Sequence, residues 1–358
     1  MKTFPRRSGS ERSEEIRNRA HMDTRDVNHQ HLTEASDAIM SCSSNCTGEF
    51  TLKARLAASL FVIGATLVGV AAAATPVAPV AVFRDPPTDK AYPATGGGLR
   101  VPSGGALMNA MVYVPAGKGP HPVVVLLHGF PGNEQNLDLA QSLRRAGWAV
   151  VTFHYRGSWG SEGTFTFDGA IEDTAAVIAW VRSPEAARHS RFDPKRIVVI
   201  GHSMGGFMAA QRCAADDSLL GCALLAPWDL SFDARLLAKA TEAERERFAK
   251  EDLVDVDGRL SGMNAQQVVE SLMKDGNKWQ LAKFAPNLAK RHALIVIAAR
   301  DSDDDKALDL LPALNAQHPK ALRTETLDSD HGFNDQRIAL QNLVLEWITT
   351  LPQPAPMP

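Results

Sequence analysis

The chain has 358 residues, of which 44% are hydrophobic and 22% charged, and its formal net charge at pH 7 is -3. This ordinary globular composition gives no reason to expect nucleic acid or an anionic membrane surface as a partner, because no basic cluster is interleaved with aromatic residues. The four cysteines, Cys42, Cys46, Cys213 and Cys222, lack the paired CxxC spacing of a metal site. The sequence therefore predicts no metal and no organic cofactor.

Residues 1–50 are polar, mix both charge signs and have no apolar periodicity. A segment of this composition does not bury enough apolar surface to offset the entropy of ordering, so we expect a disordered N-terminal extension. The segment that follows is predicted to be a signal peptide, which normally lies near the start of a chain. Translation that starts downstream, at Met40, is therefore our hypothesis, and the extension is then not translated.

Residues 51–74 have the pattern of a secretory signal peptide. Lys53 and Arg55 precede a charge-free apolar run, which ends in small residues suited to cleavage. An uncleaved membrane anchor through residues 56–74 is the alternative, because this run is just long enough to span a bilayer. Both interpretations predict an exported protein, periplasmic or extracellular, and the second predicts that it stays attached to the membrane.

After a proline-rich linker over 75–97, residues 98–358 alternate short apolar runs with amphipathic stretches. Residues 98–115 predict two strands joined by a turn. The alternation that follows predicts an α/β fold with a mostly parallel central sheet and helices on both faces. The predicted strands are residues 121–129, 149–157, 196–202, 222–228, 292–301 and 321–328. The predicted helices are residues 133–147, 169–183, 205–215, 306–318 and 338–351.

One segment interrupts this alternation. Residues 229–291 are charged and helix-prone, and they contain no apolar run that would form a strand. Open α/β sheets bind their ligands outside the carboxyl ends of the strands. We therefore expect this segment to form a helical cap insertion over that edge of the sheet, and helical packing elsewhere on the surface is the alternative.

The stretch GHSMG, residues 201–205, lies where a predicted strand meets a predicted helix. This is the G-x-S-x-G pattern of a nucleophile elbow, in which the glycines leave room for a strained turn that presents the serine hydroxyl above the sheet. The helix that follows supplies a partial positive charge and free N–H groups near that hydroxyl. Ser203 is therefore the predicted catalytic nucleophile.

A serine hydroxyl needs a general base, and after a nucleophile elbow the acid and then the histidine follow the serine along the chain. The late histidines are His292, His318 and His331. His331 lies in a loop between the last strand and the last helix, whereas the other two adjoin a strand start and a helix end. We therefore predict His331 as the base. His128 precedes the serine, and we expect it to shape a loop.

The acid that orients the imidazole is expected to follow a strand between the serine and the base. Asp301 is the first carboxylate after the apolar run of the strand 292–301, and we predict it as the catalytic acid. Asp303 is the second candidate in the same acidic run. Asp229, which follows the strand 222–228, is the third.

The oxyanion of the reaction needs preorganised hydrogen-bond donors. The backbone N–H of Met204, directly after the nucleophile, is predicted to be one of them. The second is expected from the loop after the first parallel strand, HGFPG, and the N–H of Phe130 is the predicted donor.

These motifs give the chain a resemblance to the α/β-hydrolase superfamily. HGFPG, GHSMGG, AARDSD and DHGF occur in the family's order, over roughly Gly98 to Leu351. The stretch HYRGSWGSEG is similar to a loop of prolyl-oligopeptidase-like and dienelactone-hydrolase-like members. The resemblance implies the α/β-hydrolase fold, with Ser203 as nucleophile, His331 as base and Asp301 as its orienting acid. The dienelactone enzymes proper have a cysteine at the position of Ser203, and the oligopeptidases carry a large propeller before the catalytic domain.

We therefore predict a serine hydrolase that cleaves carboxylic esters through an acyl-enzyme intermediate, with a small-molecule ester or a short peptide as substrate. An amidase, peptidase or acyltransferase with the same triad is the alternative, because the triad does not select the leaving group. A non-catalytic binding protein on a hydrolase scaffold is the second class, although no triad member is missing from the sequence. The oligomeric state is left open.

Two cysteines lie within the predicted fold. Cys213 is placed in the helix after the elbow, and Cys222 at the start of the next strand. In an oxidising compartment these two residues would form a disulfide across a short loop. Two buried apolar thiols are the equally weighted alternative.

Overall fold

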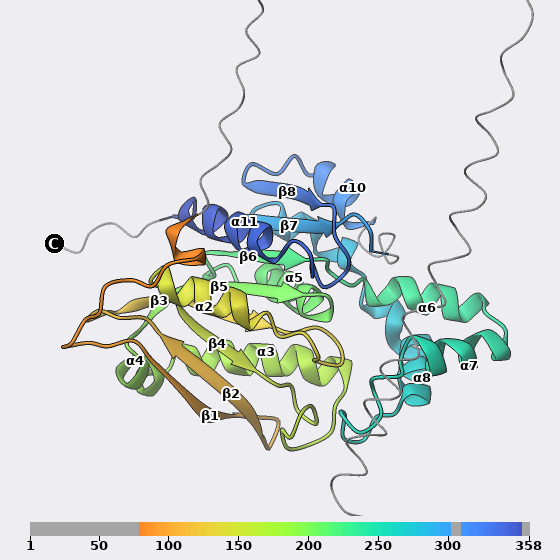
Figure 1. Ribbon diagram of the computed structural model, residues 1–358. Helices are drawn as coiled ribbons and strands as arrows, with labels where there is room; N and C mark the ends of the chain where they lie inside the picture. The colour runs from red at the N-terminus through yellow and green to blue at the C-terminus, as the bar shows by residue number, and fades with distance from the viewer. Residues whose placement is uncertain (1–78, 302–308, 353–358) are drawn as a thin grey trace, which may run out of the picture. The chain divides into compact units, whose positions relative to one another are not determined.

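The computed structural model describes residues 79–301 and 309–352, which belong to the compact unit formed by residues 74–358 (Figure 1). They form an eight-stranded sheet with the order β1-β2-β4-β3-β5-β6-β7-β8. Antiparallel pairs join β1 to β2 and β2 to β4, and all other neighbouring strands are parallel, which confirms the predicted sheet. The strands are β1 Thr95–Ser103, β2 Ala106–Val114, β3 His121–Leu127, β4 Ala149–Phe153, β5 Phe192–His202, β6 Gly221–Leu225, β7 Ala293–Ala298 and β8 Leu322–Leu327.

Helices cover both faces of the sheet, as the apolar strand runs predicted (Figure 1). Successive side chains of a strand point to opposite faces. Accordingly, Val123 and Val125 of β3 belong to the core that includes α3 and α5, whereas Val124 and Leu126 belong to the core that includes α2 and α11. The helices outside the insertion are α2 Leu137–Arg145, α3 Phe167–Val181, α4 Pro184–Ser190, α5 Met204–Ala215, α10 Leu310–Asn315 and α11 Arg337–Thr349.

The helix α4 was not predicted from the sequence. Seven residues are too few for an apolar periodicity to stand out, and only Ala186 of this helix is buried. Its start nevertheless carries a local signal, because Ser183 caps the helix by accepting a hydrogen bond from the Ala186 N–H, and proline occupies the first helical position. The order Ser-Pro-Glu was therefore the signal that identifies this helix.

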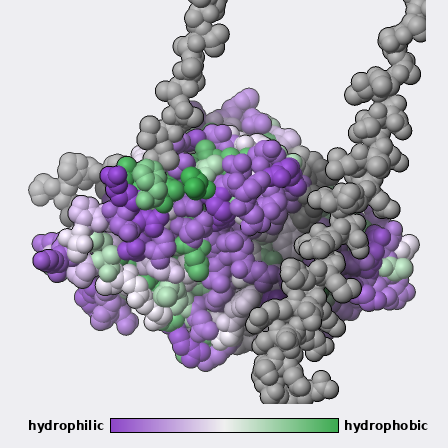
Figure 2. Space-filling view, viewed as in Figure 1, coloured by the Kyte–Doolittle hydropathy of each residue, from purple (hydrophilic) through white to green (hydrophobic). Residues whose placement is uncertain are grey.

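The predicted linker 75–97 contributes to the fold within its described part. The short helix η1 Val80–Val82 lies beside α2, where Nε of Arg145 donates to the Ala81 carbonyl at 2.5 Å. At the other end, Thr95 already belongs to β1, so the first strand begins three residues before the predicted domain boundary at 98. Figure 2 shows hydrophobic residues gathered over η1 on a face that is otherwise largely hydrophilic.

Residues 229–291 are helical, as predicted, and contain none of the eight strands. Several contacts join them to segments that follow the strands, and two of these contacts locate the insertion. Ser158, in the loop after β4, forms an isolated bridge with Leu260, and Nδ2 of Asn133, after β3, donates to Asp255 at 2.7 Å. The insertion thus lies beside the carboxyl ends of β3 and β4, and that it closes over the site stays a prediction. Its helices are α6 Leu230–Lys239, α7 Glu242–Glu251, α8 Ala265–Asp275, η2 Gly276–Lys278, η3 Leu281–Phe284 and α9 Ala285–Leu288.

The two cysteines of the fold are buried, and their thiols are free. Cys213 lies in α5 and Cys222 in β6, so the structure has the second of the two predicted alternatives. Within 79–301 and 309–352, no helix is long and apolar enough to cross a membrane. The predicted extension 1–50 and the predicted signal or anchor segment 51–74 lie outside the described residues.

Candidate active site

Ser203 occupies a sharp turn between β5 and α5. Its φ of 56° and ψ of -121° are unusual for a residue with a side chain, and such strained positions concentrate at functional sites. The turn is held on both sides, because the Ser203 N–H donates to the Leu225 carbonyl at 2.9 Å and its own carbonyl accepts from the Trp228 N–H at 3.0 Å. The predicted elbow geometry is therefore present at Ser203, which is 7% exposed.

The two glycines of the motif are required by close contacts between backbones. A Cβ on Gly201 would lie 1.9 Å from the carbonyl oxygen of Gly205, and a Cβ on Gly205 would lie 2.3 Å from the carbonyl oxygen of Leu127. Backbone atoms do not yield as flexible side chains do. The glycines thus let α5 start directly against β3 and β5, which is the physical reason for the spacing in GHSMG.

We expect the substitution Gly201→Ala to lower the free energy of unfolding by about 3 kcal/mol, because the added methyl group overlaps the Gly205 backbone. Urea unfolding followed by circular dichroism measures the change. Gly97→Ala in β1 is the matched control, since its Cβ meets nothing within 4 Å, and we expect a shift below about 0.5 kcal/mol. Equal midpoints for the two variants would contradict the close approach at Gly201.

The structure brings together the predicted base and the predicted acid. Nδ1 of His331 lies 2.5 Å from Oδ2 of Asp301, whose side chain is only 9% exposed. Asp301 lies three residues after the end of β7, and His331 lies in the loop that precedes α11. A buried carboxylate bonded to Nδ1 leaves Nε2 of the imidazole free to exchange a proton.

The other residues considered as the acid or the base lie elsewhere. Asp229 caps α6, where its Oδ1 accepts hydrogen bonds from both the N–H and the hydroxyl of Ser231. Asp303 lies outside the described residues. His292 directly precedes β7, and His318 is exposed after α10. Within the described residues, Asp301 is the carboxylate that meets His331.

His202, the residue before the serine, links the nucleophile turn to the loop of the base. Its Nε2–H donates to the His331 carbonyl at 2.8 Å, and the two rings lie 4.8 Å apart. Burial lowers the pKa of His202 to about 3, so the ring stays neutral and Nδ1 is a bare acceptor. Among the described residues, no hydrogen bond joins Ser203 Oγ to His331 Nε2, and in ligand-free sites such bonds often form only with substrate.

Arg337 holds the loop of the base from a second side. Its Nη1 donates to the Gly332 carbonyl at 2.9 Å, and its Nε donates to Asp138 in α2 at 2.9 Å. Sequence reasoning missed both Arg337 and His202 as supports of this loop. The bonds from Arg337 to Asp138 and from His202 to His331 join residues far apart in the chain, so no local pattern indicated them.

The loop HGFPG lies directly against the nucleophile. A Cβ added to Gly129 would lie 3.0 Å from Ser203 Cβ, so a side chain at this position would be tightly crowded. The N–H groups of Phe130 and Met204 donate no hydrogen bond to any described residue. Within residues 79–301 and 309–352 neither predicted oxyanion donor therefore has an acceptor, and the loops that carry them meet beside Ser203.

Aromatic rings pack around Phe130. Its ring centroid lies 5.5 Å from Phe165, 5.6 Å from Phe167 and 6.0 Å from Trp228. These three neighbours are buried, so the Phe130 side chain is fixed on one side by a dry surface. The sequence showed these aromatics only as separate residues after three different strands.

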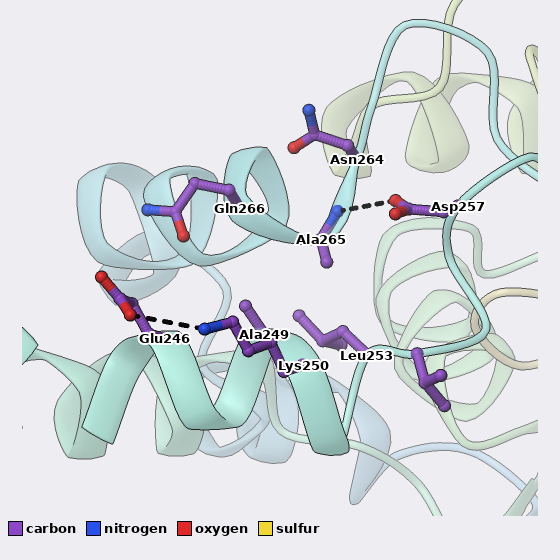
Figure 3. A pocket seen from close by; sticks show the side chains of 9 residues that line it. Glu246, Ala249, Lys250, Leu253, Asp257, Asn264, Ala265 and Gln266 are labelled. Atoms are coloured by element: carbon purple, nitrogen blue, oxygen red, sulfur yellow. Dashed lines mark hydrogen bonds and ion pairs between the residues drawn. The ribbon is translucent and has the colours of Figure 1, made fainter. Parts of the chain in front are cut away.

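A separate cavity of about 410 Å³ lies in the insertion, near the end of α7 and the start of α8 (Figure 3). Lys250 forms an ion pair with Glu246 at 3.5 Å, and the Ala265 N–H donates to Asp257 at 3.4 Å (Figure 3). None of the predicted site residues lines this cavity, so it is not the place of the predicted chemistry. The lining residues are Glu246, Ala249, Lys250, Leu253, Val254, Asp257, Asn264, Ala265 and Gln266.

The fold and the site together define an open, mostly parallel α/β protein with a strained serine turn at the carboxyl edge of its sheet. Residues 122–282 match the family model described as alpha/beta hydrolase fold. Together with the strand order, this match shows that the chain has the α/β-hydrolase fold, as the motifs indicated. A solved 2,6-dihydroxy-pseudo-oxynicotine hydrolase has the same fold, with a TM-score of 0.51 at 21% identity over 72% of this chain and 68% of that one.

Two known relatives share part of the sequence. An uncharacterized 31.7 kDa protein from the traX-finO intergenic region of Escherichia coli is 32% identical over 140 residues, which are 38% of this chain and 47% of that protein. A lysophosphatidylserine lipase of Danio rerio is 34% identical over 88 residues, which are 24% of this chain and 21% of the lipase. The chain spans less than half the length of these relatives, so they leave its substrate open.

Proposed function

We propose that the protein is a serine hydrolase that cleaves carboxylic esters through an acyl-enzyme intermediate. The observation that carries the proposal is the hydrogen bond between His331 Nδ1 and Asp301, whose side chain is 9% exposed. The loop of His331 is also bonded to His202, the residue directly before Ser203. The proposal is supported by the position of Ser203 and Asp301 after the carboxyl ends of β5 and β7, because open α/β proteins bind their ligands at that edge of the sheet.

In the proposed mechanism, Ser203 Oγ attacks the acyl carbonyl while His331 Nε2 takes the hydroxyl proton. Asp301 accepts the Nδ1–H bond and stabilises the imidazolium. The N–H groups of Phe130 and Met204 hold the oxyanion, and the imidazolium then protonates the leaving alcohol as the C–O bond breaks. A water molecule, deprotonated by His331, attacks the acyl-enzyme and releases the acid and the free serine.

An ester is the proposed substrate class because one relative is named as a lipase, although it matches only 24% of this chain. An amidase, a peptidase or an acyltransferase would use the same residues with another leaving group or acceptor. The unsatisfied N–H groups of Phe130 and Met204 favour a catalytic site over a binding site, since an oxyanion is the group that two such donors stabilise.

Paired chromogenic substrates test the substrate class. We expect the full chain to hydrolyse p-nitrophenyl acetate and p-nitrophenyl butyrate faster than the p-nitroanilides of the same two acids, measured by absorbance at equal concentrations. Anilide turnover that equals or exceeds ester turnover would replace the ester proposal by the amidase alternative. If none of the four substrates yields product, not even the one equivalent that acylation of Ser203 would release, the result would favour the binding-protein alternative over the ester proposal.

A further inference from the structure

A second pair of histidines lies behind the loop that carries Phe130. His128 directly follows β3, and His154 directly follows β4, so both residues stand at the carboxyl edge of the sheet. His128 is buried and His154 is half-buried. Their ring centroids lie 5.1 Å apart, and neither residue belongs to the proposed triad.

The hydrogen bonds of His128 fix its tautomer. Its Nδ1 lies 2.7 Å from the Gly129 carbonyl oxygen, and because a carbonyl oxygen only accepts, Nδ1 carries the hydrogen. Burial lowers the pKa of His128 to about 3, so the ring is neutral. A neutral ring that is protonated at Nδ1 presents a bare Nε2 as an acceptor.

His154 supplies the donor for that acceptor. Its Nδ1 lies 3.3 Å from Nε2 of His128, so the N–H of His154 points at the bare nitrogen. The ring of His154 stacks on Trp159 at 6.1 Å with an interplanar angle of 28°. Trp159 in turn donates from Nε1 to the Pro131 carbonyl at 2.8 Å. The loop HGFPG is thus held from behind by a chain of side-chain donors.

The last hydrogen bond of this series is made to the peptide unit between Gly129 and Phe130, which carries the proposed oxyanion donor. The Gly129 carbonyl and the Phe130 N–H belong to the same peptide plane, and in a trans peptide they point in opposite directions. A donor bonded to the carbonyl oxygen therefore fixes the direction of the N–H group and polarises it. The series of hydrogen bonds from His154 to His128 and from His128 to Gly129 therefore ends at the peptide unit of the proposed oxyanion donor, beside Ser203.

We infer that His154 is a positioning residue for the oxyanion hole, acting through His128 on the Phe130 amide. The inference rests on the proposed function, because it assigns a task to a group only where an oxyanion forms. His154 touches neither the triad nor the backbone of Phe130 among the described contacts, so its effect passes through the histidine pair.

The test compares His154→Leu with His154→Asn. Leucine removes the donor and keeps an apolar side chain, whereas asparagine places an amide N–H close to the position of Nδ1. We expect His154→Leu to lower kcat for p-nitrophenyl butyrate by about threefold to tenfold, the value of one hydrogen bond, with KM changed less than about twofold. We expect His154→Asn to recover most of that loss. His189→Leu, at an exposed position in α4, is the matched control and should keep the wild-type kcat.

A second readout separates positioning from packing. An alkylboronic acid forms a B–O bond with the serine oxygen, the serine proton passes to the imidazole, and the anionic tetrahedral boron group occupies the oxyanion hole. Its inhibition constant should rise in His154→Leu by the same factor as kcat falls, while inhibition by the product butyrate stays unchanged.

Two results overturn the inference: a wild-type kcat and boronate affinity in His154→Leu, or a loss in His154→Leu that His154→Asn shares in full. Failure of the proposed function is a separate outcome, because it shows as activity that survives Ser203→Ala in a chain with both histidines intact. Activity that is lost in Ser203→Ala but unchanged in His154→Leu therefore contradicts only the positioning role of His154 and leaves the proposed function intact.

Discussion

Replacing Ser203 by alanine is expected to lower the turnover of p-nitrophenyl butyrate by about a millionfold, to the level that the rest of the site sustains without a nucleophile. The physical reason is that no acyl-enzyme forms when the hydroxyl on the strained turn is absent. The measurement is kcat under saturating substrate, corrected for hydrolysis by buffer and by heat-denatured protein.

The matched control for this variant is Ser218→Ala. Ser218 is exposed in the loop between α5 and β6, and its hydroxyl bonds to Asp216 and Arg182 rather than to any group of the candidate site. We expect its turnover to equal that of the wild type. Undiminished turnover in Ser203→Ala would remove the nucleophile from the mechanism and with it the proposed function.

Asp301→Asn is expected to lower kcat by about ten thousandfold while the protein stays folded. The amide that replaces the carboxylate provides no negative charge to stabilise the imidazolium, and its N–H group favours the wrong tautomer of His331. Steady-state kinetics measure the loss, and an unchanged urea midpoint shows that the fold is intact.

Asp303→Asn and Asp229→Asn are the matched variants, because the sequence also offered these two carboxylates as the acid. We expect both to retain kcat, and Asp229→Asn to keep the fold as well, since Asp229 caps α6 and asparagine caps a helix about as well as aspartate. A large loss of kcat in Asp303→Asn together with an active Asp301→Asn would reassign the acid.

The order of strands and helices followed from the sequence because the physical signals are local. Runs such as VVVLL in β3 and GCALL in β6 are apolar without alternation, which is typical of strands buried on both faces. The serine turn was predicted for the same reason, since a strand, a glycine-flanked serine and a helix are adjacent in the chain. Asp301 and His331 were predicted from the order serine, acid and histidine along the chain.

The supports of the site did not follow from the sequence, because they are contacts between distant segments. His202 was visible beside Ser203, but its bond to the His331 carbonyl depends on how the last loop returns to β5. Arg337 directly precedes the predicted helix 338–351, and nothing around it in the sequence indicates its bond to Asp138. His154 reads as the end of a strand, and only the packing of β3 beside β4 brings its Nδ1 to His128.

The insertion is a second case in which contacts between distant segments did not follow from the sequence. Its helical character was predicted from charge and the lack of strand runs, yet the bridge between Ser158 and Leu260 and the bond between Asn133 and Asp255 were not. These contacts fasten the insertion to the loops after β3 and β4, beside the histidine pair.

The most direct measurement is covalent labelling of the full chain with a fluorophosphonate probe, followed by peptide mass spectrometry. The probe reacts with a serine only where a base and oxyanion donors activate it, so labelling reports the assembled site without knowledge of the substrate. We expect one adduct, on Ser203, that is absent from Ser203→Ala and strongly slowed in Asp301→Asn. A wild-type chain that stays unlabelled at Ser203, or that is labelled equally well after Ser203→Ala, would contradict the assignment of Ser203 as an activated nucleophile.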